Sequence, residues 1–292
     1  MARKHKKIPE LPFRVLNGPL QGTYRELLGK IEKLDAEKLA NGLPVIIRLH
    51  LQLAYMTYEA TRYLCADSPE DASRIIQFIA VVPPMARSVL DGLFNTIYLS
   101  TDPAEKTRRY YRAAWKETRR DYELYKQRYK ASRLWRDWLK SFRRLERLLA
   151  KEEGLSKKDY KAVDWWPIPS QMLKDKRLPV DIRHFFLYLT DWYYCAYSSE
   201  AHLSWPGLSV RGSIFLMDMR SNSDRQMAMK RKSDLIARAA LLLLMTLSEV
   251  SVLFQLKLGT QLQYIWTLLL HPYEEAKELY EMRYQGLLQK CQ

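Results

Sequence analysis

Apolar side chains recur at intervals of three and four residues through most of this 292-residue sequence. That interval matches the period of an α-helix, and no segment shows the two-residue alternation of a half-buried strand. Proline and glycine divide the chain into separate helical segments, most sharply at Gly42-Leu43-Pro44, Asp102-Pro103 and Pro206-Gly207. The pattern predicts an all-α fold, a multi-helix bundle of about nine or ten helices with no sheet.

The chain is long enough to bury one large core without disulfides or a structural metal. We interpret residues 1–20 as a basic N-terminal arm and residues 21–292 as a single helical domain. The arm contains prolines where a secretory signal would be apolar, and the three cysteines are too widely spaced for a disulfide framework or a metal site. These features predict a cytoplasmic protein, and no motif in the sequence indicates a cofactor.

One apolar run, from Ala239 to Leu256, is long enough to raise the question of a membrane span. Glu249 lies within that run, and an ionised carboxylate would be costly in the centre of a bilayer. We therefore predict a buried helix of the bundle at this position and no membrane span.

The positive charge of the chain is concentrated in one segment. Residues 103–151 carry 17 Lys and Arg against 6 Asp and Glu, out of a net charge of +15 for the whole chain. The segment reads as a pair of long helices with a break near Ala131-Ser132, and its aromatic residues at helical spacing are predicted to point inward. The outward cations then form a solvent-facing ridge: Arg112, Lys116, Arg119, Lys126, Lys130, Arg136, Lys140 and Arg143.

This ridge has two possible partners. A concentrated positive charge attracts phosphate backbones, and it attracts acidic protein surfaces equally well. Because the aromatic residues are predicted to point inward, stacking on nucleic-acid bases is not expected. RNA or another polyanion and an acidic protein or second subunit therefore both stay open as partners.

Two polar sets lie in apolar surroundings, and each repeats every four residues. The first is Arg87, Asp91 and Asn95, and the second is Tyr194, Ser198 and His202. A helix stacks such a set on one face. Because the neighbouring residues predict burial, each set needs a partner or a chemical task, and the two sets are candidates to contact each other.

Each set has a functional and a structural interpretation. Arg87 could clamp an anion, or it could pair with Asp91 and fix the register of the helix. His202 could exchange protons beside Ser198, or it could join the ends of two helices. Ser198 lacks the Gly-x-Ser-x-Gly elbow of a nucleophile, and Glu200 with His202 lacks two further ligands for a metal.

The same residues resemble the motifs of a widespread bacterial family of all-helical proteins. The resemblance covers residues 45–206 and rests on Arg87-Ser88 followed by Asp91, on Tyr98-Leu99, and on the set Tyr194, Ser198 and His202. Asp91 stands where that family usually has Glu. The family is similar in helical layout to the HEPN group, many of whose members are metal-independent ribonucleases of toxin and phage-defence systems.

The resemblance implies a catalytic set of His202, Arg87, Asp91 and Ser198, supported by a structural polar network of Asn95 and Tyr194. In HEPN ribonucleases an Arg and a His bracket the scissile phosphate, with His moving protons and Arg stabilising the charge. This chain departs from their Arg-x6-His pattern, because its one match, Arg177 to His184, includes Pro179. Two hypotheses follow: an RNA-binding HEPN-like protein with ribonuclease activity, or a non-catalytic helical module that docks an acidic partner.

Overall fold

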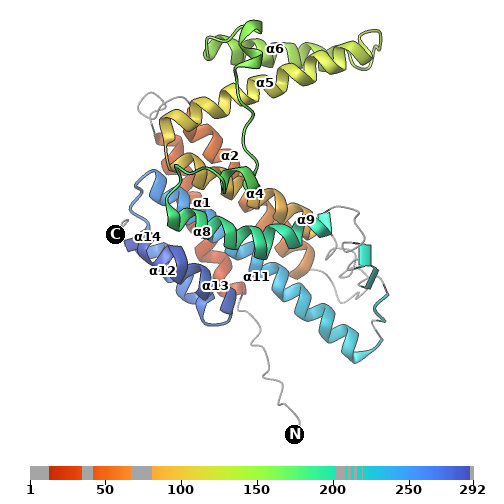
Figure 1. Cartoon of the computed structure of the whole chain (residues 1–292). Coiled ribbons are helices and arrows are strands. Elements are labelled where there is room, and N and C mark those ends of the chain that lie inside the picture. Colours follow the sequence, from red (N-terminus) through yellow and green to blue (C-terminus); the bar gives the residue numbers. More distant parts are fainter. Residues whose placement is uncertain are drawn as a thin grey trace.

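The computed structural model describes residues 13–34, 42–66, 81–201, 208–209, 212–213, 216–218 and 220–289. Every regular element in these ranges is helical, which confirms the all-α prediction (Figure 1). The principal helices are α1 (Phe13–Lys33), α2 (Leu43–Ala66), α4 (Val82–Ser100), α5 (Pro103–Tyr129), α6 (Arg136–Glu152), α7 (Pro169–Met172), α8 (Val180–Leu189), α9 (Cys195–Ala201), α11 (Asn222–Leu253), α12 (Gly259–Leu270), α13 (Glu274–Leu279) and α14 (Gln285–Gln289).

Helix α11 is the centre of the bundle. It packs against α1, α2, α4, α12 and α14, and the residues from Ala239 to Ser251 are all buried. Among the described helices it is the one long and apolar enough to cross a membrane, and 89% of that apolar window is buried within the protein. Glu249 is only 2% exposed there and accepts hydrogen bonds from Arg283 at 2.5 and 2.8 Å. The carboxylate is therefore neutralised inside the core by a bidentate partner.

Helix α4 begins and α5 follows where the proline signals predict. Pro83 lies in the first turn of α4, where its missing N–H costs no helical hydrogen bond. Asp102 caps α5 by accepting a hydrogen bond from the backbone N–H of Glu105 at 3.3 Å, and Pro103 occupies the first turn. The predicted break near Ala131-Ser132 is confirmed as the turn between α5 and α6.

The N-terminal boundary differs from the prediction. Helix α1 begins at Phe13, within the residues assigned to the basic arm, and Leu16 and Leu20 are completely buried. These leucines continue the apolar stripe of Leu27 and Ile31, so their burial outweighs the hydrogen bond that Pro19 removes from the helix interior. The predicted helix end at Ala40 lies outside the described residues, as does the predicted helix start at Glu70.

Helix α2 also turns a different side to the core than its most regular apolar spacing suggests. Leu49, Leu53 and Met56 are 56%, 40% and 66% exposed, whereas Leu51 and Tyr58 are fully buried. The helix is apolar on both sides, so spacing alone does not determine which side faces α4 and α11.

The single helix predicted from Gln261 to Leu288 is interrupted. Pro272 ends α12 at Leu270, and the chain restarts as α13 at Glu274. The helix predicted from Val180 to Leu203 is continuous to Ala201 but contains a π-helical turn at Thr190–Tyr194 between α8 and α9. That turn directly precedes the second polar set, and π turns change which side chains share a helix face.

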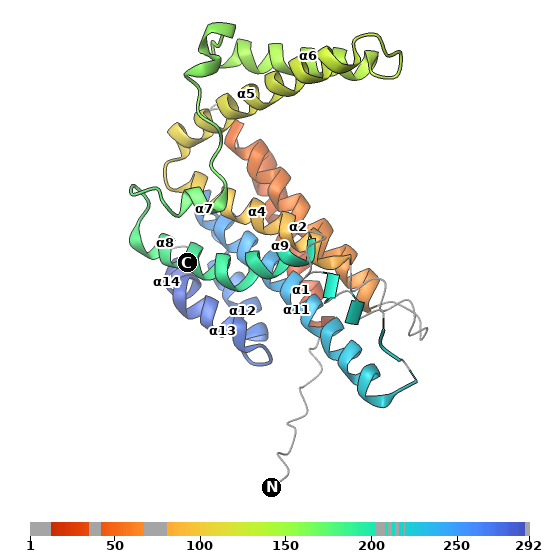
Figure 2. The same ribbon diagram turned by 45° about the vertical axis from the view of Figure 1, so that its right-hand side comes forward.

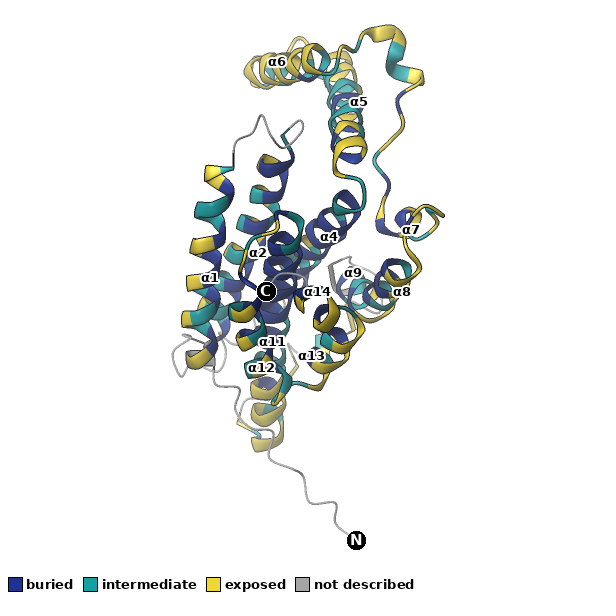
Figure 3. Ribbon diagram, turned by 90° about the vertical axis from the view of Figure 1, so that its left-hand side faces the viewer, coloured by how far each residue is buried: buried dark blue, intermediate teal, exposed yellow. Residues whose placement is uncertain are grey.

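Helices α5 and α6 form an antiparallel hairpin that projects from the bundle (Figures 1 and 2). A small core of Trp115, Leu149 and Val163 holds the base of the hairpin together. Most of α6 is exposed, in contrast to the buried helices of the bundle (Figure 3). The hairpin therefore has two packed layers near its base and solvent on most other sides.

Candidate functional site

The two polar sets meet across the interface of α4 and α9. The Nε atom of Arg87 donates a hydrogen bond to Oγ of Ser198 at 2.8 Å, although the residues are 111 positions apart. The guanidinium of Arg87 also lies over the ring of Tyr194, 3.4 Å from its centroid, and pairs with the carboxylate of Asp91 one turn along α4. Arg87 thus makes a hydrogen bond, a cation–π contact and an ion pair at once.

This cluster lies at the surface of the interface and is only partly buried, unlike the burial that the sequence predicts. The side chain of Arg87 is 18% exposed and that of Asp91 is 44% exposed. Burial raises the pKa of Tyr194, and the nearby charge of Arg87 opposes that rise. Because the guanidinium already has three partners, an incoming anion would have to displace Asp91 from it.

The third member of the α4 set, Asn95, contacts a different segment. Its Oδ1 accepts a hydrogen bond from the indole Nε1 of Trp166 at 2.8 Å. One turn further along α4, Tyr98 donates to Oδ2 of Asp175 at 2.7 Å, and burial together with this hydrogen bond raises the pKa of Tyr98 to about 12. The polar file on α4 therefore joins α9 at one end and the irregular segment that carries Trp166 at the other.

His202 follows Ser198 by one helical turn in the sequence, but it lies outside the described residues, and so does the side chain of Glu200. Its position relative to Arg87 stays a prediction. The structure brings together Arg87, Asp91, Ser198 and Tyr194, which are four of the residues selected from the sequence. The chance match Arg177–His184 has no comparable contact: Arg177 pairs with Asp175 and Glu105, and His184 is exposed on α8.

The predicted cationic ridge is correct in part. Lys126, Lys130, Arg136, Lys140 and Arg143 are exposed, and Arg112 is half-buried. The prediction that two further members face solvent is wrong.

Lys116 is buried and donates to the backbone carbonyl of Val163 at 2.6 Å. Arg119 is 13% exposed and pairs with Glu146 of α6 at 2.8 Å. Both residues lie on the side of α5 that faces α6 and the segment after it, which the sequence spacing of α5 alone does not reveal.

The distal part of the hairpin is strongly cationic. Residues 124–151 contain ten Lys and Arg, all exposed, against Asp137 and Glu146. A groove of about 370 Å³ runs between α5 and α6 on one side, and its outer walls include the cations Lys126, Arg143, Arg147 and Lys157. None of these four forms an ion pair with a carboxylate in the described part of the chain. They are therefore available to an anionic ligand.

Aromatic residues fill the tip of the hairpin. Tyr129 stacks on Trp135 with ring centroids 4.3 Å apart, and Tyr125, Trp138 and Phe142 extend the cluster. The prediction that the aromatic stripe points inward holds for Trp115 at the base but not for Trp138, which is 59% exposed. Two helices alone cannot cover a full aromatic face, because no third layer packs on the tip.

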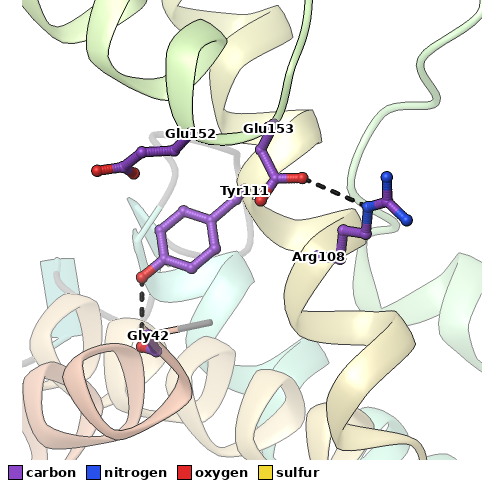
Figure 4. A pocket seen from close by; sticks show the side chains of 5 residues that line it. All are labelled: Gly42, Arg108, Tyr111, Glu152 and Glu153. Carbon is purple, nitrogen blue, oxygen red and sulfur yellow. Dashed lines mark hydrogen bonds and ion pairs between the residues drawn. The ribbon is translucent and has the colours of Figure 1, made fainter. Parts of the chain in front are cut away.

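The hairpin rests on the bundle at a cavity of about 440 Å³ lined by Gly42, Arg108, Tyr111, Glu152 and Glu153 (Figure 4). Tyr111 donates a hydrogen bond to the carbonyl oxygen of Gly42 at 3.2 Å, and Arg108 lies 3.6 Å from Glu153. Burial raises the pKa of Glu153, and Arg108 opposes that rise. The cavity contains none of the residues selected from the sequence and joins the hairpin to the start of α2.

Sequence reasoning overlooked two polar arrangements. His50 of α2 is packed against α4, with its Nδ1 atom 3.2 Å from Oγ1 of Thr96, and burial lowers its pKa to about 4. Glu275 accepts hydrogen bonds from Tyr193 at 2.9 Å and Arg238 at 3.0 Å, which joins α13 to α11 and to the π turn. Neither has a spacing pattern that would reveal it, because every partner comes from a distant helix.

Comparison with known proteins gives no relative for this chain. No family model matches it, no curated protein is similar to it, and no solved structure matches its fold. Among the described residues, no group of three or more His, Cys, Asp and Glu side chains is placed to hold a metal ion. The arguments below therefore rest on the geometry of the chain itself.

Proposed function

We propose that this protein binds RNA through the cationic groove of its projecting hairpin. The observation that carries the proposal is the set of cations on the groove, Lys126, Arg143, Arg147 and Lys157, which have no carboxylate partners in the described residues. Elsewhere on α5, cations such as Arg119 and Arg120 are already paired with Glu146 and Asp121. Unpaired cations on two facing helices are suited to successive phosphates of a backbone.

The direct test is a salt titration of binding to a labelled single-stranded RNA. The triple variant Lys126→Glu, Arg143→Glu and Arg147→Glu should lower the slope of log affinity against log salt by about two to three, since each lost phosphate contact removes nearly one released counterion. These side chains are exposed, so the fold should not change.

A matched control makes the same change of charge elsewhere. Lys33, Lys257 and Lys277 are exposed on α1, in the turn between α11 and α12, and on α13. Replacing these three by Glu should leave the salt slope nearly unchanged. Equal losses for the two triple variants would mean that net charge rather than the groove drives binding. A flat salt slope for the unchanged protein would remove RNA and favour the alternative, an acidic protein partner.

Metal-independent ribonuclease activity is the second candidate, as a HEPN-like toxin or phage-defence enzyme. It is favoured by the contact of Arg87 with Ser198, because His202 comes one helical turn after Ser198 in the sequence. In this hypothesis Arg87 stabilises phosphate charge, Asp91 orients Arg87, Ser198 positions it, and His202 exchanges protons.

The ribonuclease hypothesis predicts that His202→Ala abolishes RNA cleavage in the presence of a chelator while thermal stability stays the same. If the substitution instead lowers the free energy of unfolding by a few kcal/mol, His202 has a structural role. Absence of cleavage by the unchanged protein would reject the enzyme hypothesis without affecting RNA binding by the hairpin.

A further inference from the structure

The outer side of α6 carries an apolar stripe that nothing covers in the described part of the structure. Leu134, just before the helix, is 90% exposed, and Trp138, Leu145 and Leu148 are 59%, 46% and 51% exposed. Ser141 lies between them and is also exposed. The spacing is that of a heptad, with Trp138 seven residues before Leu145 and Leu134 seven before Ser141. A helix with this spacing presents a narrow seam to a second helix.

The seam is separate from the two other sides of α6. The side that meets α5 carries Trp135, Phe142 and Leu149. The cations Arg143 and Arg147 line the groove, about half a turn of helix away from the seam. Asp137 and Arg144 border the seam on the edge away from α5, again seven residues apart.

We propose that this seam binds the same seam of a second copy of the chain, with the two α6 helices antiparallel. One symmetric register satisfies every position between Leu134 and Leu145. Leu134 packs on the partner's Leu145, and Trp138 packs on the partner's Ser141, so that a large side chain meets a small one. By symmetry each of these layers occurs twice, as an interface between identical surfaces requires.

The border charges fit the same register. Asp137 of each copy lies across from the partner's Arg144, which gives two ion pairs of opposite charge. In the single chain Asp137 is 90% exposed and pairs only with Lys140, which is 70% exposed, so that contact is readily exchanged. The strongly positive groove sides of the two hairpins point away from the seam, which keeps their mutual repulsion low.

The proposed contact is short. The layers from Leu134 to Leu145 span about 17 Å of helix, so the interface is smaller than that of an obligate dimer. We expect a reversible dimer that forms at micromolar or higher concentration. The helical bundles lie at opposite ends of such a dimer, and two cationic grooves remain open on its outer sides.

Sedimentation velocity of the full chain over a wide concentration range tests the proposal. The unchanged protein should shift from monomer towards dimer, and Leu145→Glu should remain monomeric because it places a carboxylate in two layers. The control is Leu53→Glu on α2, where a leucine of similar exposure lies on a different apolar surface. A protein that stays monomeric at every concentration, or a dimer lost with Leu53→Glu but kept with Leu145→Glu, would overturn it.

A charge exchange tests the register itself. Asp137→Arg alone and Arg144→Asp alone should each weaken the dimer at least tenfold, because each places like charges across the seam. The double variant should restore the affinity, and so should an equimolar mixture of the two single variants, which forms complementary heterodimers. If neither the double variant nor the mixture restores dimerisation, the antiparallel register is wrong.

Discussion

Arg87 donates from Nε to Oγ of Ser198 at 2.8 Å, and this single hydrogen bond joins two helices that are 111 residues apart in the chain. The ring of Tyr194 lies beneath the same guanidinium, so α9 contributes two partners to one side chain of α4. Whatever chemistry the cluster performs, it also fixes how the two helices pack. The first prediction follows from this double attachment.

Ser198→Ala should lower the free energy of unfolding by about 1 kcal/mol, because Arg87 keeps its ion pair and its ring contact. Arg87→Ala removes all three contacts and should cost about 2 to 3 kcal/mol. Urea denaturation measures both values. Ser170 is exposed on α7, so Ser170→Ala is a control with no expected loss. An unchanged midpoint for Arg87→Ala would show that the cluster does not stabilise the fold.

The pair formed by Glu249 and Arg283 should be much more sensitive, since the two side chains are only 2% and 9% exposed. Glu249→Gln leaves a buried guanidinium without its counter-charge and should destabilise the protein by about 3 to 5 kcal/mol. The double variant Glu249→Leu with Arg283→Met should cost less than Glu249→Gln, because it leaves no isolated charge. Thermal or urea unfolding of the two variants decides the point, and the reverse order of stability would contradict it.

His50 predicts a pH dependence of stability. Burial lowers its pKa to about 4 in the folded protein, whereas an exposed histidine titrates near 6.5. Between these values the unfolded chain binds a proton that the folded chain does not, so the free energy of unfolding falls as the pH decreases. The loss attributable to His50 should reach at most about 3 kcal/mol by pH 4.

The variant His50→Gln isolates that contribution, because glutamine can keep a hydrogen bond to Thr96 without titrating. Urea unfolding from pH 7.5 to 4 should show a shallower loss of stability for His50→Gln than for the unchanged protein. Parallel curves for the two proteins would mean that His50 does not titrate differently on unfolding. His184→Gln is the control, since His184 is exposed.

Gly42 and Gly154 both adopt positive φ angles, +78° and +63°, but their surroundings differ. A Cβ atom on Gly42 would overlap the hydroxyl of Tyr111 and lie 3.0 Å from its Cζ atom, whereas a Cβ on Gly154 would meet nothing within 4 Å. Both Gly→Ala substitutions should cost about 1 kcal/mol of backbone strain. Gly42→Ala should cost clearly more, because it also displaces Tyr111, which holds the hairpin to the bundle.

Limited proteolysis provides the second measurement for this pair. If Tyr111 anchors the hairpin, Gly42→Ala should increase cleavage within residues 103–152, and Gly154→Ala should not. Equal stability and equal cleavage of the two variants would show that the contact of Tyr111 with Gly42 does not hold the hairpin in place.

The sequence by itself determined the helical class of this protein and many of its boundaries. Helix periodicity is a local property, and proline and capping side chains act within one turn, so Pro83 and Asp102 mark their helices without tertiary information. The four-residue spacing of Arg87 and Asp91, and of Tyr194 and Ser198, likewise identified residues that share a helix face.

Only the tertiary structure decided which faces meet. The apolar spacing of α2 does not show that Leu49 is exposed and Leu51 buried, because α2 is apolar on both sides. The cations of α5 look alike in sequence, yet Lys116 is buried on a carbonyl and Lys126 faces a groove, because α6 and the chain after it cover one side only. Contacts such as Arg87 with Ser198 depend on how distant helices pack, and that is a property of the whole bundle rather than of any segment.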